Sequence, residues 1–171
     1  SKLKIPAFER KTDNVCLTQP GEYAFYDGAI KSSETGEYKH RDYKLKIAEQ
    51  VVSHSTAKQA FGPVKPYMVG ALSRFNNNFD QLMPKAKEVA EKLGLEAPSH
   101  NPYHITYAQI VEKVHCMEFM MKLFDELLSR GIKDESEERP PIAGWTTKLP
   151  PINKSWGVGV VEAPRGLLVH E

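Results

Sequence analysis

The chain has 171 residues, enough to bury a core without disulfides or bound metal ions. Its 23 lysines and arginines nearly balance 22 aspartates and glutamates, so the net charge of +1 favours neither nucleic acid nor an anionic membrane. Cys16 and Cys116 belong to no Cys-x-x-Cys pair, which argues against a disulfide framework and favours a reducing compartment. We expect no signal peptide, and no apolar run approaches the roughly 18 residues that span a bilayer.

Residues 1–42 are predicted to form an irregular segment followed by a small antiparallel sheet. Prolines interrupt residues 1–20, so no regular element is expected there. The dipeptide Asp27-Gly28 lies between aromatic and β-preferring residues in the sequence EYAFYDGAI, which predicts a hairpin turn. A second turn is predicted at Thr35-Gly36.

Residues 43–132 are predicted to form a helical core. Apolar residues recur at helical spacing between Tyr43 and Val52, and Asp42 is a suitable cap for a helix there. The run Asn76-Asn77-Asn78 predicts the cap of the next helix, over residues 79–93, with a start or kink at Pro84 and an end at Gly94. Arg74 is interpreted as a salt-bridge or interface residue.

The longest helical pattern covers residues 105–128 and is apolar over much of its circumference, so this helix is expected to be buried or bound to a partner. Its methionine-rich stretch, residues 117–121, is interpreted as core. His100 and His104 flank Pro102 and are interpreted as caps of this helix.

Residues 133–171 are predicted to contain a polar loop, a proline-rich linker with Trp145, and a strand over residues 156–163. All elements together predict an α+β, mainly helical fold of one structural domain, with long packed helices and a small antiparallel sheet. The chain starts at Ser1 without a methionine and stops after an apolar run, so we expect a piece of a longer protein.

The segment Glu162-Ala163-Pro164-Arg165-Gly166 is the first candidate site. Pro164 fixes the backbone before Arg165, so the arginine can present five donors in one direction to an anion or a partly negative ligand. The residues alone favour a structural ion pair between Arg165 and Glu162. A nucleotide site is disfavoured, because Gly157 and Gly159 lie inside a predicted strand and no third glycine follows at the required spacing.

Glu112 and His115, with Glu118 beyond, form a second candidate site on one face of the long helix. This spacing is half of a di-iron carboxylate motif, which needs two such helices, and no other predicted helix contains Glu-x-x-His. We therefore favour a polar stripe that hydrogen-bonds neighbouring helices.

The tail GVGVVEAPRGLLVH, residues 157–170, resembles the G-x-G-x-x-E-A-P-R-G-x-L-x-H signature of nickel–iron (NiFe) hydrogenase large (alpha) subunits. Three more stretches resemble the soluble multimeric cytoplasmic group, whose members are F420-, NAD(P)- or heterodisulfide-reductase-linked. They are YAFYDGAI (23–30), KPYMVGALSRFNNN (65–78) and YHITYAQIVEKVHCME (103–118). Gln109 stands where that last helix often has arginine. The family's two cysteine motifs, R-x-C-G-x-C and D-P-C-x-x-C, are absent, so the resemblance is to an interior fragment and Cys16 and Cys116 are not interpreted as metal ligands.

The resemblance implies a parent enzyme that oxidises H2 reversibly to protons and electrons at a nickel–iron centre carrying cyanide and carbonyl ligands. Electrons would pass to the iron–sulfur clusters of a small subunit, then to further electron-transfer subunits. Arg165 would lie beside the iron's ligands, Ala163 and Pro164 would form the adjoining wall, and His170 would serve packing or a proton route.

For the chain itself, the resemblance implies a cytoplasmic location and neither nucleic-acid nor membrane partners. We expect the isolated chain to be inactive, to hold no metal and to self-associate. The alternative is a truncated hydrogenase-like paralogue that acts as a non-catalytic scaffold, with residues 105–128 as its partner surface. A helical metal–carboxylate protein is the third possibility.

Overall fold

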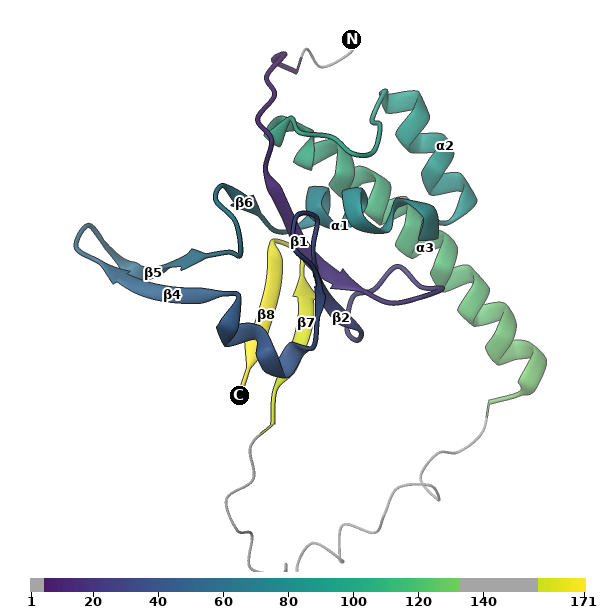
Figure 1. Cartoon of the computed structure of the whole chain (residues 1–171). Coiled ribbons are helices and arrows are strands. Elements are labelled where there is room, and N and C mark those ends of the chain that lie inside the picture. The colour runs from purple at the N-terminus through teal and green to yellow at the C-terminus, as the bar shows by residue number, and fades with distance from the viewer. Residues whose placement is uncertain (1–4, 133–156) are drawn as a thin grey trace, which may run out of the picture.

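The computed structural model, which describes residues 5–132 and 157–171, has at its centre a four-stranded sheet of order β3-β2-β1-β6 (Figure 1). The strands are β1 (Asp13–Thr18), β2 (Ala29–Ser32), β3 (Gly36–Tyr38) and β6 (Tyr67–Met68). β1 is buried along its whole length, and it pairs antiparallel with β2 and parallel with β6. Helix α1 (Ala71–Asn78) and the C-terminal hairpin both contact β1, so this strand connects the two layers of the fold.

In the described ranges, three α-helices cover one side of β1: α1 (Ala71–Asn78), α2 (Pro84–Leu93) and α3 (Ile105–Arg130). α1 contacts both β1 and α3, and α2 packs along α3 (Figure 1). Short 3-10 helices occupy His40–Leu45, Phe79–Gln81 and Pro102–His104. The helices share a core with one another, in which small residues on α2 and α3 let the two backbones approach closely. The buried residues of this core are Tyr23, Ala71, Leu72, Phe75, Leu82, Ala86, Ala90, Leu95, Ala108 and Val111.

Two hairpins complete the described part of the chain. β4 (Ala48–Val52) and β5 (Ser55–Phe61) form a largely exposed hairpin that projects away from the sheet (Figure 1). β7 (Gly159–Ala163) and β8 (Gly166–His170) form the second hairpin, which lies beside β1 and β2. Its Val160 joins a separate core cluster with Val15, Leu17, Ala24 and Ile30. The C-terminal segment is therefore packed against the N-terminal sheet.

Local patterns predicted several elements correctly. The α+β class is confirmed, as are the long helix α3, the start of α2 at Pro84 and its end at Gly94, which adopts the left-handed conformation. The antiparallel pair β2–β3, with a turn before Gly36, confirms the predicted small sheet. The strand predicted near the C-terminus is β7, and β8 extends it into a hairpin.

The prediction of an irregular segment over residues 1–20 is wrong, because β1 begins at Asp13 and is the most buried strand of the sheet. Polar residues in β1 concealed it from a hydrophobicity pattern. Asp13 is buried yet accepts hydrogen bonds from the hydroxyls of Ser32 and Ser33, so partners elsewhere in the chain offset the cost of its burial.

The helix predicted over residues 43–52 is also wrong: a 3-10 helix ends at Leu45 and strand β4 begins at Ala48. The apolar residues that suggested a helical face do not form one buried face: Ile47 packs against the core, whereas Leu45 is 82% exposed and Val51 is 81% exposed. Pairing with β5 satisfies the backbone of this segment in place of helical hydrogen bonds.

The three asparagines do not cap the helix over residues 79–93 as predicted, because they form the last turn of α1. Asn77 and Asn78 donate from their side chains to the carbonyl oxygens of Asn14 and Leu17 in β1, each at 2.8 Å. These contacts dock α1 onto the sheet, so long-range hydrogen bonds override the local capping preference of asparagine.

The predicted loop, linker and Trp145 lie outside the described residues. Among the residues that the structure describes, no helix combines the length and the apolar character needed to cross a bilayer.

Candidate functional site

The turn between β7 and β8 consists of Pro164 and Arg165, because Ala163 pairs with Gly166 on either side of them. The ring of Pro164 holds its φ near about −65°, which excludes the type I′ and II′ turns that need a positive φ at this position. Those are the turns whose twist matches a two-residue hairpin. The turn at Pro164 and Arg165 therefore depends on contacts from outside the hairpin.

On one side, the segment that precedes α1 packs directly against this turn. Gly70 has a φ of +93°, and a Cβ atom on it would lie 3.0 Å from the carbonyl oxygen of Arg165. Gly166 has a φ of +144°, and a Cβ atom there would lie 2.5 Å from Cγ2 of Val69. Only glycine permits both the backbone conformation and the close approach at these two positions.

On the other side, Arg74 of α1 reaches the backbone of the same turn. Its Nη1 donates to the carbonyl oxygen of Ala163 at 3.1 Å, and its Nη2 donates to that of Pro164 at 3.3 Å. Nη1 also donates to Oε2 of Glu162 at 2.8 Å. The side chain of Arg74 is only 1% exposed, so these contacts form away from competing water.

Glu112 of α3 fixes Arg74 from the opposite direction in a bidentate pair, with Nε to Oε1 at 2.6 Å and Nη2 to Oε2 at 2.8 Å. The Tyr23 hydroxyl donates to Oε1 of Glu112 at 2.9 Å, and the Leu17 backbone N–H donates to Oε1 of Glu162 at 2.8 Å. We call Tyr23, Arg74, Glu112 and Glu162 the Arg74 cluster. It joins β1, α1, α3 and β7 through charged and polar contacts.

Burial and charge act against each other within the Arg74 cluster. Burial raises the pKa of the Glu162 carboxyl, and the Arg74 guanidinium opposes that rise. Burial disfavours the charged form of Arg74, but hydrogen bonds and attraction from Glu112 and Glu162 outweigh it and raise the pKa of Arg74. Burial together with the neighbouring Glu112 raises the pKa of Tyr23 well above its usual value, which keeps the hydroxyl protonated as a donor.

A cavity of about 720 Å³ opens beside the cluster. Its walls are largely apolar, and the Phe25 ring lies with its centroid 5.7 Å from the guanidinium carbon of Arg74. The lining includes Phe25, Cys116, Met117, Ala163 and Pro164. Arg74, Glu112 and Glu162 bring polar groups to the same cavity, so it combines an apolar wall with buried charge.

The structure brings together some of the predicted site residues and separates others. Ala163 and Pro164 both line the cavity, whereas Arg165 is exposed in the turn next to them and is not part of the lining. His170 is exposed at the far end of β8, paired with Gly159. His170 lies five residue steps along the strand from Arg165, a distance of roughly 16 Å, so the two do not meet in one site within this chain.

The ion pair proposed between Glu162 and Arg165 is wrong, because the Glu162 carboxylate accepts from Arg74 and from the Leu17 backbone instead. The interpretation of Arg74 as a salt-bridge residue is confirmed. Sequence reasoning missed that Arg74, Glu112 and Glu162 form one cluster. The available signal was that Arg74 and Glu112 both fall on the buried faces of their helices, where a charged side chain requires a partner.

The polar stripe on α3 is confirmed. Beyond the contacts of Glu112, the Nδ1 atom of His115 accepts from the Met83 N–H at 3.1 Å, and Glu118 accepts from the Lys85 N–H at 2.9 Å. These two N–H groups lie at the start of α2, where the helix itself offers no acceptor, so α3 caps α2. In the described ranges, no three His, Cys, Asp or Glu side chains are grouped so that they could hold a metal ion.

His115 is expected to make the stability of the chain depend on pH. Burial lowers its pKa from 6.5, with Glu112 and Glu118 opposing, and protonation of Nδ1 would remove the acceptor for Met83. Because the folded pKa is the lower one, the stabilisation is complete above pH 6.5 and is lost as the pH falls through the folded pKa.

His115→Gln, measured by urea unfolding at several pH values, should lose less stability on acidification than the natural chain. His54→Gln, in the exposed β4–β5 turn, is the control, and equal pH dependence in all three proteins would contradict the assignment.

Cys16 is buried and hydrogen-bonded rather than poised as a ligand. Asn77 Nδ2 donates to its Sγ at 3.3 Å, and burial raises the pKa of the thiol to about 12. A protonated thiol binds metal ions poorly, because the thiolate is the ligand form. Cys116 is exposed on α3, and burial of its surroundings raises the pKa of this thiol as well.

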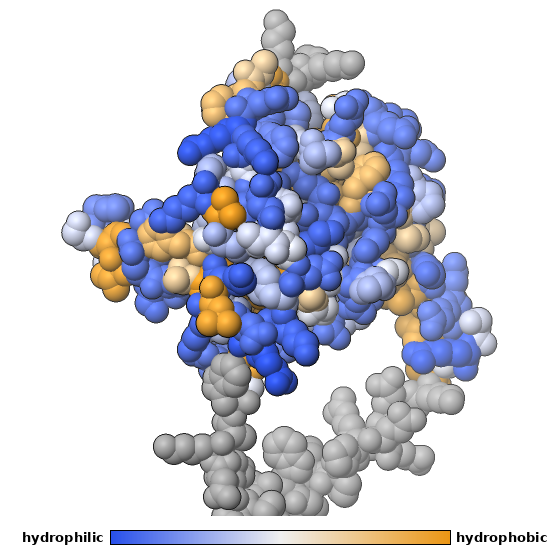
Figure 2. Space-filling model, viewed as in Figure 1, coloured by the Kyte–Doolittle hydropathy of each residue, from blue (hydrophilic) through white to orange (hydrophobic). Residues whose placement is uncertain are grey.

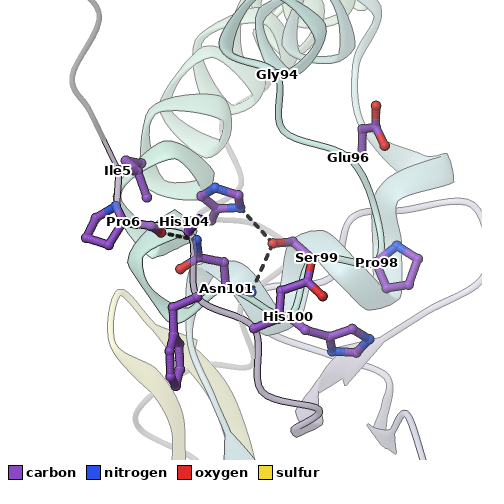
Figure 3. A pocket seen from close by; sticks show the side chains of 12 residues that line it. Ile5, Pro6, Gly94, Glu96, Pro98, Ser99, His100, Asn101 and His104 are labelled. Carbon is purple, nitrogen blue, oxygen red and sulfur yellow. Dashed lines mark hydrogen bonds between the residues drawn. The ribbon is translucent and has the colours of Figure 1, made fainter.

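The loop before α3 lines another cavity, of about 550 Å³ (Figure 3). The predicted capping role of the His100 and His104 side chains is wrong: His104 is the N-cap residue of α3 but its side chain makes no capping hydrogen bond, and Asn101 caps the preceding 3-10 helix by accepting from the Tyr103 N–H at 3.0 Å. His104 points to the Ser99 hydroxyl instead, at 2.8 Å, and Asn101 also donates to the carbonyl oxygen of Pro6. These bonds fix the conformation of the loop.

Comparison with known proteins gives these features a context. No protein-family model matches the chain. It is similar to the alpha subunit of sulfhydrogenase 1 from Pyrococcus furiosus, with 37% identity over 149 residues that cover 86% of this chain and 32% of that relative. It is also similar to a subunit of the F420-non-reducing hydrogenase from Methanothermobacter marburgensis, with 30% identity over 196 aligned positions covering 99% of this chain and 38% of the relative.

A bacterial relative extends the same comparison. The beta subunit of the NAD-reducing hydrogenase HoxS from Cupriavidus necator is 29% identical over 145 residues, which cover 78% of this chain and 27% of that relative. The chain spans about one third of the length of the curated relatives it matches. The chain is thus a homologue of hydrogenase alpha subunits, related to them over about 90% of its own length.

Proposed function

We propose that this chain forms part of the large (alpha) subunit of a cytoplasmic nickel–iron hydrogenase, within the large-subunit fold. The parent enzyme would oxidise H2 reversibly to protons and electrons. The observation that carries the proposal is that Ala163 and Pro164, in the EAPRG segment, line a largely apolar cavity with Arg165 exposed beside them. The hydrogenase names of its relatives support this assignment.

The cofactor of the parent enzyme would be a nickel–iron centre with cyanide and carbonyl ligands, which supplies the hydrogen-splitting chemistry when bound. The described residues do not form a ligand set for it, so its protein ligands would come from outside them. This chain would contribute one wall, in which Ala163 and Pro164 exclude water. Arg165 would donate charge-assisted hydrogen bonds to the negatively charged nitrogen of a cyanide. His170 would take a packing or proton-route role at the other end of the hairpin.

The partners that this function requires are a small subunit with iron–sulfur clusters, which accepts the electrons, and further electron-transfer subunits. H2 would be the substrate. The near-neutral net charge of +1 supports a function without nucleic acid or membrane.

Metal analysis of the isolated chain tests the proposal. We expect substoichiometric nickel and iron, and no reduction of an electron-accepting dye under H2. The same chain assembled with the cysteine-bearing parts of the large subunit, together with the small subunit, should contain both metals and reduce the dye. Stoichiometric nickel together with H2-dependent dye reduction by the isolated chain would contradict the proposal.

A non-catalytic scaffold is the second candidate function, and the exposed half of α3 favours it. Beyond His115 the helix leaves large apolar side chains in solvent among charged ones, as Figure 2 shows at the projecting end of the helix. They are Met117, Met120, Met121, Leu123, Phe124 and Leu128. If this chain bound a partner through the exposed face of α3 within a hydrogenase-like assembly that contains no nickel, that result would favour the scaffold function.

Under either function the isolated chain should self-associate, because the exposed apolar face of α3 has no partner among the described residues. We expect sedimentation velocity to show a concentration-dependent shift from monomer to larger species. Phe124→Gln with Met121→Gln should weaken the association, whereas Lys122→Gln on the same helix should not. A chain that stays monomeric at high concentration would exclude this role of the surface.

A further inference from the structure

We infer that Arg74 is a positioning residue for the candidate site: it sets the conformation of the Pro164–Arg165 turn, and through the turn the place of the Arg165 guanidinium. The inference rests on the proposed function for its catalytic meaning. Its structural part rests on contacts of this chain alone. Arg74 touches the backbone of the turn and not the reacting groups, so its effect would be transmitted through Arg165.

The turn itself depends on contacts from outside the hairpin. Pro164 excludes the turn types that a two-residue hairpin prefers, so the observed turn is not the one that the strands alone would select. Its carbonyl groups at Ala163 and Pro164 accept hydrogen bonds from the two terminal nitrogens of one guanidinium. A planar fork that binds two successive carbonyl oxygens fixes their relative orientation, which a single donor cannot do.

The side chain of Arg74 also has little conformational freedom of its own. Glu112 binds it bidentately from α3, Glu162 binds it from β7, and the Tyr23 hydroxyl orients Glu112. The guanidinium uses its donors on four acceptor groups inside the protein. A rotation of Arg74 would break several of these bonds at once, so its fixed guanidinium restrains the conformation of the turn.

The start of α1 and the residue just before it contact both sides of the turn. The Gly70 carbonyl accepts the Arg74 N–H at 3.0 Å in the first turn of α1, and Gly70 itself packs against the carbonyl of Arg165. The residues from Val69 to Arg74 therefore enclose the turn from two directions. Any shift of α1 along β1 would move the exposed Arg165 relative to the cavity beside it.

Hydrogen–deuterium exchange of the 171-residue chain tests the structural part. Arg74→Lys keeps the charge and loses the fork, so we expect the amides of Gly166 and Leu168, which the register of β7 and β8 places at hydrogen-bonded pairs, to exchange about ten-fold faster or more, with the β2–β3 amides unchanged. Arg130→Lys, at the exposed end of α3, is the matched control. Tyr23→Phe removes only the hydroxyl bond to Glu112 and should give a smaller acceleration at the same amides, even if Arg74→Lys does not fold. Unchanged turn amides in both variants, or uniform acceleration through the chain, would overturn the inference.

Infrared spectroscopy of the assembled hydrogenase tests the link to the site. If Arg74 acts through Arg165, Arg74→Lys should shift the cyanide stretching bands in the same direction as Arg165→Lys, and the double variant should shift them no further. A shift with Arg165→Lys and none with Arg74→Lys would overturn the positioning role and leave the proposed function standing. No shift with Arg165→Lys would count against the proposed function, while the exchange measurement still decides the positioning of the turn.

Discussion

Replacing Arg74 with methionine is expected to lower the free energy of unfolding by about 3–5 kcal/mol, the usual loss when one partner of a buried ion pair is removed. Methionine fills a similar volume but leaves the carboxylates of Glu112 and Glu162 buried without their cation. Urea denaturation of the natural and variant chains measures the difference. Arg130→Met, on an exposed position of α3, is the matched control and should change stability by no more than about 0.5 kcal/mol.

The origin of that loss can be separated from the loss of packing. Adding Glu112→Gln and Glu162→Gln to Arg74→Met removes both unpaired charges, so a large part of the stability should return. If Arg74→Met alone stays within about 1 kcal/mol of the natural chain, the cluster does not join the helices and the hairpin in the way described.

Arg165→Lys in the assembled hydrogenase is expected to lower the rate of H2 oxidation about 10²–10³-fold. This is the usual effect of removing one well-placed hydrogen-bond donor to a charge that develops in the reaction or resides on a ligand. Lysine keeps the positive charge but cannot present two parallel donors from a planar group. Nickel and iron contents should stay unchanged, because Arg165 is exposed in the turn and is proposed to bind a ligand of the metal, not the metal itself.

Dye reduction under H2, with metal analysis of the same samples, measures this effect. Arg10→Lys is the control, since Arg10 is exposed and lies in the N-terminal segment before β1. A variant that loses activity only in proportion to lost nickel would assign Arg165 to assembly of the centre. Full activity in Arg165→Lys would remove this residue from the site.

The elements that the sequence predicted are those whose signals are local. Helical periodicity, a proline that starts α2 and a glycine that ends it all act within a few residues. β1 could not be predicted in this way, because the burial of Asp13 and Asn14 depends on hydroxyl partners in and just after β2. β4 likewise depends on its pairing with β5, and its exposed Val51 contributed to a misleading helical pattern.

For the candidate site, too, the features with local signals were predicted and those that depend on distant residues were not. The order of residues around Pro164 predicted a backbone fixed before Arg165, and in the structure these two residues form the turn of the hairpin, which was not predicted. The partner of Glu162 could not be predicted, because Arg74 lies 88 residues away and the nearby Arg165 was the simpler choice. Pair selection depends on how α1, α3 and β7 pack, which no short segment of the sequence encodes.

The most direct test of the central claim, that the Pro164–Arg165 turn of this chain lies against the ligands of a nickel–iron centre, is the infrared spectrum of assembled hydrogenase with Arg165→Lys. A charge-assisted donor on a cyanide nitrogen changes the cyanide stretching frequency, so its loss should move the cyanide bands while the metal content stays constant. Cyanide bands at unchanged frequency, in a variant that folds and holds both metals, would contradict the claim.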